Sequence, residues 1–226
     1  MMVWGMLLML LMALPVSAPA EGEQTGPTRI FLVRHAEYVK GDPGKPLSKL
    51  GRARADVLAR CFDGVAVTHV FASHTERSRD TVTPLATAHG LSVRQHPAPG
   101  ATLAGKVVDN RTSGKAAIAP LLSALAEVPA GSTVVVGGNS GNLFAIMAGL
   151  GVPVAGDDRR EVPPEAGDGV SVAKTLPCRD KSCFPKKDFA SLWLVVVPSS
   201  PSGKASMARI HYGDPMMALT AAVGRD

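Results

Sequence analysis

An apolar run that ends in a glycine-rich turn constrains the fold of this chain more than any other stretch. Residues 133–136 read TVVV, a turn with two glycines and Asn139 follows, and an apolar segment with helical spacing continues to Leu150. A fully apolar run such as residues 30–33, which read IFLV, is typical of a strand in a parallel sheet that is buried on both faces. A strand, a tight turn and a helix also present backbone N–H groups to an anion. The turn carries no charged side chain, so a nucleophile or a cation for an anion site must come from elsewhere.

Other apolar runs alternate with segments of helical spacing along the chain. Ser48 is a predicted helix N-cap, and Pro84 should interrupt the helix that contains it. Strands are predicted at 30–33, 68–72, 91–95, 133–136, 191–197 and 205–211, and helices at 48–62, 73–89, 115–125 and 142–150. This alternation predicts an α/β fold, a three-layer α/β/α sandwich with a mostly parallel central sheet.

The N-terminus has the character of an export signal. Residues 1–20 carry no charged side chain, and a short apolar run ends in Ala18-Pro19-Ala20, which is typical of a signal-peptide cleavage site. The run is too short to span a bilayer, so no stable membrane span is expected. We expect a signal peptide at 1–20, one domain at 21–226, and a periplasmic or secreted protein. An uncleaved anchor is the alternative, because no Lys or Arg precedes the apolar run.

Charge and cysteine content limit the classes of partner. The formal net charge is +5, but Lys and Arg are scattered and aromatic residues make up only 4% of the chain, so no nucleic-acid partner is expected.

Export would permit a local disulfide between Cys178 and Cys183, with two free thiols as the alternative. This pair lacks further ligands at zinc spacing, so no zinc site is expected. Cys61 falls in a helical pattern and is expected to be buried.

Two predicted strand ends carry residues that could bind and attack a phosphoryl group. The first strand ends in Arg34-His35-Ala36-Glu37, and the second is followed by a loop that carries Arg77. In open α/β sheets, binding sites form at the carboxyl ends of strands. A neutral imidazole is a nucleophile near pH 7, and a guanidinium binds phosphoryl oxygens in a bidentate fork. These residues therefore predict a phosphate site, with solvated strand ends as the alternative.

Together these motifs resemble the histidine phosphatase superfamily, which has the phosphoglycerate mutase-like fold. The resemblance rests on FLVRHAE, DPGKPLSKLGRARA and VFASHTERSRDT, and it covers roughly residues 30–91. It implies that His35 is the nucleophile and becomes a phosphohistidine. It also implies that Arg34 and Arg77 bind the transferring phosphoryl group, and that neither a metal nor another cofactor takes part.

One family position is occupied differently in this sequence. In the family, a second His contacts the phosphate after the strand that corresponds to 133–136, and Asn139 occupies that position here. An asparagine can donate one hydrogen bond to a phosphate oxygen, but it carries no charge. We expect the backbone N–H groups of residues 140–142 to compensate in part.

The proton donor for the leaving group is the other open position. Asp109 lies in an irregular stretch where a donor loop would fall, and it is the first candidate. Glu37 is the alternative, although an outward-facing structural role suits it better, and Glu127 is a poor candidate at a helix end. His74 could contribute to the pocket, but an exposed loop residue is expected.

These observations predict a phosphomonoester hydrolase that acts on a small phosphorylated substrate. It would work through a phosphohistidine at His35, without metal, on an extracytoplasmic substrate. The alternative is a protein of the same fold that binds a phosphorylated ligand without turning it over, which the asparagine at position 139 favours.

Overall fold

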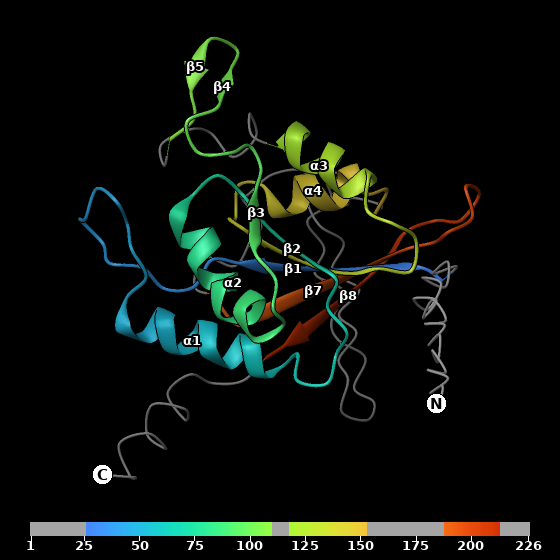
Figure 1. Cartoon of the computed structure of the whole chain (residues 1–226), viewed down its shortest axis with the longest axis horizontal. Coiled ribbons are helices and arrows are strands. Elements are labelled where there is room, and N and C mark those ends of the chain that lie inside the picture. The colour runs from blue at the N-terminus through green and yellow to red at the C-terminus, as the bar shows by residue number, and fades with distance from the viewer. Residues whose placement is uncertain (1–25, 110–117, 153–187, 213–226) are drawn as a thin grey trace, which may run out of the picture.

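The computed structural model describes residues 26–109, 118–152 and 188–212, and Figure 1 shows their arrangement. The helices in this part are α1 (Lys49–Arg60), α2 (Glu76–Ala88), α3 (Ile118–Ala126) and α4 (Leu143–Gly149). The strands are β1 (Thr28–Arg34), β2 (His69–Ala72), β3 (Val93–Gln95), β4 (Thr102–Leu103), β5 (Lys106–Val107), β6 (Thr133–Gly138), β7 (Ser191–Val197) and β8 (Ser206–His211). The expected signal peptide and the expected Cys178–Cys183 disulfide lie outside the described residues.

Six strands form one sheet in the order β3-β2-β6-β1-β7-β8. The first four are parallel to one another, whereas β7 runs antiparallel to β1 and β8 antiparallel to β7. The predicted mostly parallel sheet is therefore confirmed, with an antiparallel pair at one edge. β4 and β5 form a separate hairpin, in a stretch for which the sequence predicted no element.

Helices cover both faces of this sheet and give three layers (Figure 1). The side chains of β6 alternate between two apolar cores because successive residues of a strand point to opposite faces. Val135 packs with α1 and α2, whereas Val134 and Val136 pack with α3 and α4. Each fully buried valine contributes about 1.5–3 kcal/mol of stabilisation. This two-sided burial explains why residues 134–136 are all valines.

The start of α1 is held against the loop that follows β1. The Ser48 hydroxyl accepts a hydrogen bond from the Gly51 N–H at 3.1 Å, so the predicted N-cap is confirmed. A Cβ atom at Gly51 would collide with the carbonyl oxygen of Glu37. Glycine therefore allows α1 to approach the backbone just beyond the end of β1.

Two sequence expectations about helices are wrong. α2 continues through Pro84 to Ala88, because the apolar face on either side of the proline packs into the core and outweighs the one lost N–H. Cys61 is exposed rather than buried, since α1 ends at Arg60 and the cysteine lies at the C-cap, where the chain turns away.

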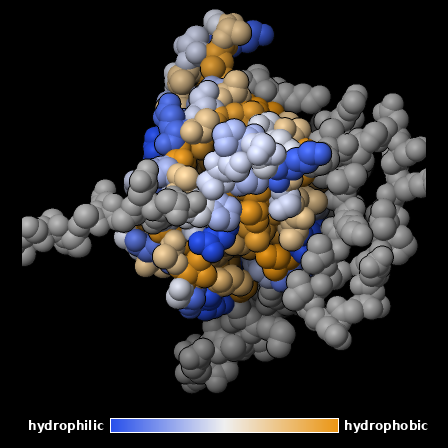
Figure 2. Space-filling view, turned by 90° about the vertical axis from the view of Figure 1, so that its right-hand side faces the viewer, coloured by the Kyte–Doolittle hydropathy of each residue, from blue (hydrophilic) through white to orange (hydrophobic). Residues whose placement is uncertain are grey.

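The β4–β5 hairpin stands away from the sheet and its helices in Figures 1 and 2. Val107 in this hairpin is 66% exposed. On the rest of the face drawn in Figure 2, hydrophilic and hydrophobic residues are interspersed. In the described part of the chain, no helix combines the length and the apolar character that a membrane crossing needs.

Candidate active site

The carboxyl ends of three parallel strands, β1, β2 and β6, lie side by side. Arg34 of β1 lies opposite Gly138 of β6, and Ala72 of β2 lies opposite Gly137. Beyond the ladder, the His35 N–H donates to the Gly138 carbonyl at 2.8 Å. The backbone therefore holds the end of β1 directly beside the turn after β6, at the edge where α/β proteins place their sites.

His35 is buried, and one of its ring nitrogens already has a partner. Its Nδ1 lies 2.9 Å from the carbonyl oxygen of Ala36. Because a carbonyl oxygen only accepts hydrogen bonds, Nδ1 carries a proton and the Nε2 lone pair of the neutral ring is available for attack at phosphorus. Burial lowers the pKa of His35 most, the bond to Ala36 opposes this, and the charges of Arg77 and Arg34 lower it further, from 6.5 to about 3. The imidazole is therefore neutral at pH 7.

Arg77, the second residue of α2, brings a guanidinium group into the same region. Its Nε and Nη1 atoms are buried, and no residue in the described ranges accepts a hydrogen bond from either atom. Burial lowers the pKa of Arg77, and the Tyr38 phenol opposes this effect. Buried guanidinium N–H groups without acceptors are costly, so an anion that accepts from them would stabilise the site.

Arg34 lies at the end of β1, and its guanidinium group contacts Asp188 and Phe189, which come just before β7. Its Nη1 donates to the Asp188 carbonyl oxygen at 3.2 Å, and its guanidinium carbon stands 4.3 Å from the centre of the Phe189 ring. Burial lowers the pKa of Arg34 most, Asp188 and Tyr38 oppose this, and the charge of Arg77 lowers it further. The two guanidinium groups are therefore close enough to repel each other.

Two hydroxyl groups on α2 connect the strand ends. Thr81 accepts from the Ala36 N–H at 2.9 Å and donates to the Arg77 carbonyl at 2.7 Å. Ser78 donates to the Gly138 carbonyl at 3.2 Å. These bonds fasten the first turn of α2 to the backbone of β1 and β6. Sequence reasoning gave these hydroxyls no role, although the four-residue spacing of Arg77 and Thr81 belongs to the motif that carried the resemblance.

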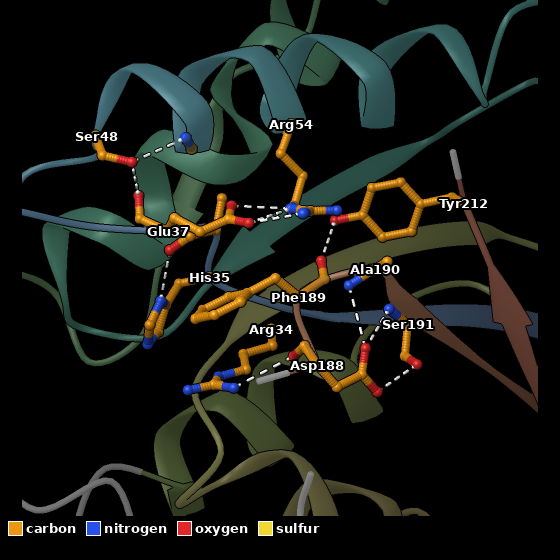
Figure 3. A network of polar contacts seen from close by, with 12 residues as sticks. Arg34, His35, Glu37, Ser48, Arg54, Asp188, Phe189, Ala190, Ser191 and Tyr212 are labelled. Carbon is orange, nitrogen blue, oxygen red and sulfur yellow. Dashed lines mark hydrogen bonds and ion pairs between the residues drawn. The ribbon is translucent and has the colours of Figure 1, made fainter. Parts of the chain in front are cut away.

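Glu37 is committed to an ion pair with Arg54 of α1 (Figure 3). Its two carboxylate oxygens accept from the Arg54 Nε at 3.0 and 2.8 Å and from Nη2 at 2.6 Å. The Glu37 side chain is only 18% exposed, so the expectation that it faces outward is wrong. Because its oxygens are engaged by a guanidinium, this geometry supports a structural role and not proton donation.

Hydrogen bonds within the turn after β6 connect Asn139 to Gly141 and Asn142. The Asn139 Oδ1 accepts from the Gly141 N–H at 2.9 Å, and its carbonyl oxygen accepts from the Asn142 N–H at 2.9 Å. The Asn142 Oδ1 in turn accepts from the Asn139 N–H at 2.8 Å. The expectation that the N–H groups of 140–142 bind a phosphate is therefore wrong for Gly141 and Asn142. The amide nitrogen of the Asn139 side chain takes no part in these bonds.

The remaining candidates lie in three different connections between helices and strands. Asp109 is exposed and follows the β4–β5 hairpin, and its role as proton donor stays a prediction. Glu127 is exposed just beyond α3. His74 is only 4% exposed, so the expectation of an exposed loop residue is wrong. Ser73 and Thr75, in the same short connection between β2 and α2, are buried as well.

Sequence reasoning missed two aromatic residues that flank the candidate nucleophile. The Tyr38 ring centre lies 5.5 Å from that of His35, and the Phe189 ring centre lies 6.2 Å from it. Tyr38 directly follows the R-H-A-E motif, so its place in the chain was a usable signal. Phe189 comes more than 150 residues later, just before β7, and no pattern in the sequence links it to His35.

The charged groups at the carboxyl ends of these strands favour the binding of an anion. In residues 26–109, 118–152 and 188–212, no three His, Cys, Asp or Glu side chains come together in a way that could hold a metal ion. The carboxylates of Glu37 and Asp188 are each in an ion pair with an arginine. The arrangement can hold a phosphoryl group between two guanidinium groups and present an imidazole nitrogen to its phosphorus.

The sequence matches a known family over part of its length. Residues 30–98 match the model of the histidine phosphatase superfamily (branch 1). The matched segment contains Arg34, His35 and Arg77, and it ends before Asp109 and Asn139. A comparison with curated protein sequences finds no match.

Solved structures with the same fold share little sequence with this chain. Mycobacterial hydrolase 2 is 16% identical, with a TM-score of 0.52 over 88% of this chain and 98% of the hydrolase. A proposed alpha-ribazole-5'-P phosphatase from Escherichia coli K-12 is 15% identical, with a TM-score of 0.52 over 83% of this chain and 97% of that protein. These likenesses show the fold. The chain has the mostly parallel α/β/α architecture of the phosphoglycerate mutase-like fold, and its residues 30–98 are similar to the histidine phosphatase superfamily.

Proposed function

We propose that this protein is a phosphomonoester hydrolase that works through a phosphohistidine at His35. The observation that carries the proposal is the pairing of a buried, neutral imidazole with the Arg77 guanidinium, whose Nε and Nη1 are buried without an acceptor in the described residues. A phosphate dianion offers the acceptors and the charge that these groups lack. Arg34 adds a second positive charge beside the same imidazole.

The reaction has two displacements at phosphorus. The His35 Nε2 attacks the phosphorus, an N–P bond forms, and the bond from phosphorus to the ester oxygen breaks. The leaving oxygen departs with the bonding electrons and takes a proton, for which Asp109 is the proposed donor. Water then attacks the phosphohistidine: its oxygen binds phosphorus while the N–P bond breaks, and one of its protons passes to the Asp109 carboxylate that the first displacement left. Inorganic phosphate leaves and the neutral imidazole is restored.

The two arginines supply the electrostatic stabilisation in this scheme. Guanidinium groups at Arg34 and Arg77 neutralise charge that develops on the phosphoryl oxygens, which a metal ion does in other phosphatases. We therefore propose turnover without metal. The charge-free N-terminal segment and its Ala-Pro-Ala ending motivate a periplasmic or secreted location and an extracytoplasmic substrate.

A second function is favoured by the turn at Asn139. This side chain carries no charge, and its oxygen accepts from the Gly141 N–H within the turn. With one positive charge fewer around the phosphate, the protein could bind a phosphorylated ligand without turning it over. Turnover assays separate this binding function from the hydrolase.

The test is hydrolysis of phenyl phosphate in the presence of EDTA by the wild type and by His35→Ala, Asn139→His and Asp109→Asn. His211→Ala is the matched control, because this histidine is exposed on β8. We expect slow turnover in the wild type and the control. We expect a loss on the order of 10⁴-fold or more in His35→Ala, as for other covalent nucleophiles.

The results discriminate among the functions. No wild-type turnover from about pH 4 to pH 8, together with calorimetric binding of inorganic phosphate, would establish the binding function instead. Equal turnover in the wild type and His35→Ala would exclude the phosphohistidine. If Asp109→Asn retains full activity toward an alkyl phosphate, the proton donor is another residue.

A further inference from the structure

Hydrogen bonds from different parts of the fold hold the backbone around His35. The His35 N–H donates to the Gly138 carbonyl at 2.8 Å, and the next N–H, that of Ala36, donates to the Thr81 hydroxyl at 2.9 Å. The Ala36 carbonyl accepts from the His35 Nδ1. Ala36 therefore connects the imidazole to α2, because its N–H is bound by a side chain of that helix while its carbonyl binds the ring.

The chemistry of a hydroxyl group decides the direction of the hydrogen bonds at Thr81. A hydroxyl has one proton to donate and two lone pairs that accept. The Thr81 proton is donated to the Arg77 carbonyl at 2.7 Å, and a lone pair accepts from the Ala36 N–H. One fully buried hydroxyl thus joins the backbone of α2 at Arg77 to the backbone beside the candidate nucleophile.

Ala36 is itself fully buried and forms a small apolar cluster with Leu47 and Ala55. An N–H group in such a place has no water to replace a lost acceptor, and a buried N–H without an acceptor is destabilising. Removal of the Thr81 hydroxyl would therefore favour a rotation of the Ala36 backbone toward another acceptor. Such a rotation moves the Ala36 carbonyl away from the imidazole.

The Ala36 carbonyl determines which nitrogen of the His35 ring carries the proton. A neutral imidazole has two tautomers, and the nitrogen that donates a hydrogen bond keeps its proton. With Nδ1 bonded to the carbonyl, Nε2 keeps the lone pair. Loss of this bond would allow the other tautomer, in which Nε2 is protonated and cannot attack phosphorus.

We propose that Thr81 is a positioning residue for His35, whose hydroxyl holds the Ala36 backbone so that the Ala36 carbonyl keeps the proton on Nδ1 and the lone pair on Nε2. This role rests on the proposed function, in which Nε2 attacks phosphorus. The same hydroxyl binds the carbonyl of Arg77. The nucleophile and one guanidinium group of the proposed phosphate site therefore share one support on α2.

The kinetic test compares Thr81→Val, which keeps the branched shape without the hydroxyl, with Thr81→Ser, which keeps the hydroxyl. In Thr81→Val we expect kcat for phenyl phosphate to fall about 10- to 100-fold, with KM changed by less than about threefold, because the nucleophile is misplaced while the guanidinium groups remain. Thr81→Ser should keep kcat within about threefold of wild type, because the serine hydroxyl can make both hydrogen bonds.

Nitrogen-15 NMR of the His35 ring measures the tautomer at pH 7 and needs no turnover. The chain has six histidines, so the signals that disappear in His35→Gln identify this ring. We expect a protonated Nδ1 in the wild type and in Thr81→Ser. In Thr81→Val a share of the tautomer with a protonated Nε2 should appear.

Thr83→Val is the matched control on the same helix. The Thr83 hydroxyl donates to the Arg79 carbonyl at 2.9 Å, four residues back as Thr81 does, but Thr83 is exposed. We expect wild-type kcat and a wild-type ring spectrum in this variant. A loss equal to that of Thr81→Val would assign the effect to the helix and overturn the proposal.

Urea unfolding shows whether each variant is folded. If Thr81→Val does not fold, Thr81→Cys replaces it, because a thiol is only a weak acceptor, and its kcat should fall below that of Thr81→Ser. A wild-type tautomer in the variant that lacks the hydroxyl would overturn the proposal, as would a loss in Thr81→Ser as large as in Thr81→Val. Failure of the phosphohistidine scheme would appear separately, as an absence of wild-type turnover, while the ring spectra would still decide the role of Thr81.

Discussion

The loop after β1 and the turn after β6 end at the same level of the sheet, with Arg34 opposite Gly138, yet they are built in opposite ways. The β1 loop carries charged groups, and its contacts reach outward to α1, to α2 and to the segment before β7. The turn carries no charge, and its hydrogen bonds run among Asn139, Gly141 and Asn142. The candidate catalytic groups therefore lie at one strand end, while its neighbour contributes a turn without charged side chains whose hydrogen bonds run within itself.

The largest effect should follow from removal of the charge on the β1 loop. Arg34→Leu eliminates a guanidinium group beside the nucleophile, and we expect kcat/KM for phenyl phosphate to fall by about 10²–10³-fold. Arg29→Leu is the control, because this exposed arginine lies near the opposite end of the same strand. An equal loss in both variants would mean that Arg34 acts only through net charge.

The ion pair behind the β1 loop should matter for stability. Arg54→Leu leaves the Glu37 carboxylate largely buried and without its guanidinium, and we expect a loss of about 3 kcal/mol in the free energy of unfolding, measured in urea. The exposed pair of Arg79 and Asp80 gives the comparison, since Arg79→Leu should cost less than about 1 kcal/mol. Similar losses in the two variants would contradict the importance assigned to burial.

Adding charge to the β6 turn tests whether neutrality limits the rate. Asn139→His introduces an imidazole, but it also removes the acceptor for the Gly141 N–H. We therefore expect a gain of about tenfold in kcat, which is less than the 10²–10³-fold that a fully preorganised contact can supply. Kinetics of phenyl phosphate hydrolysis measure this gain. A rate at or below that of the wild type would show that the turn cannot place a positive charge at the phosphate.

A further test concerns the pH dependence of stability at His35. Its pKa is about 3 in the folded protein and 6.5 as the ordinary value, so between these pH values the unfolded chain binds a proton that the folded chain does not. Wild type should therefore lose stability as the pH falls below about 6.5, and His35→Gln should lack this contribution. Urea unfolding at pH 7 and pH 4 should show the variant gaining relative to wild type, whereas a constant difference would contradict the depressed pKa.

The comparison of the two regions also explains which features could be predicted. The residues of the β1 loop and of the first turn of α2 form short motifs, so Arg34, His35 and Arg77 were recognisable from local spacing in two successive βα units. The ion pair of Glu37 with Arg54 could not be predicted in this way, because Arg54 lies on the next helix and reaches Glu37 only when that helix packs against the β1 loop. His74 was misjudged for the same reason, since burial of a loop depends on what packs over it.

The sequence by itself determined the parallel core and the local placement of the candidate nucleophile. Both follow from short-range patterns, an apolar run such as 133–136 and charged residues directly after a strand. Only the tertiary structure decided that Asp188 and Phe189 contact Arg34. Asp188 lies 154 residues from Arg34 along the chain, and the two meet because β7 pairs antiparallel with β1. Such a pairing depends on the packing of the whole sheet, which no local pattern encodes.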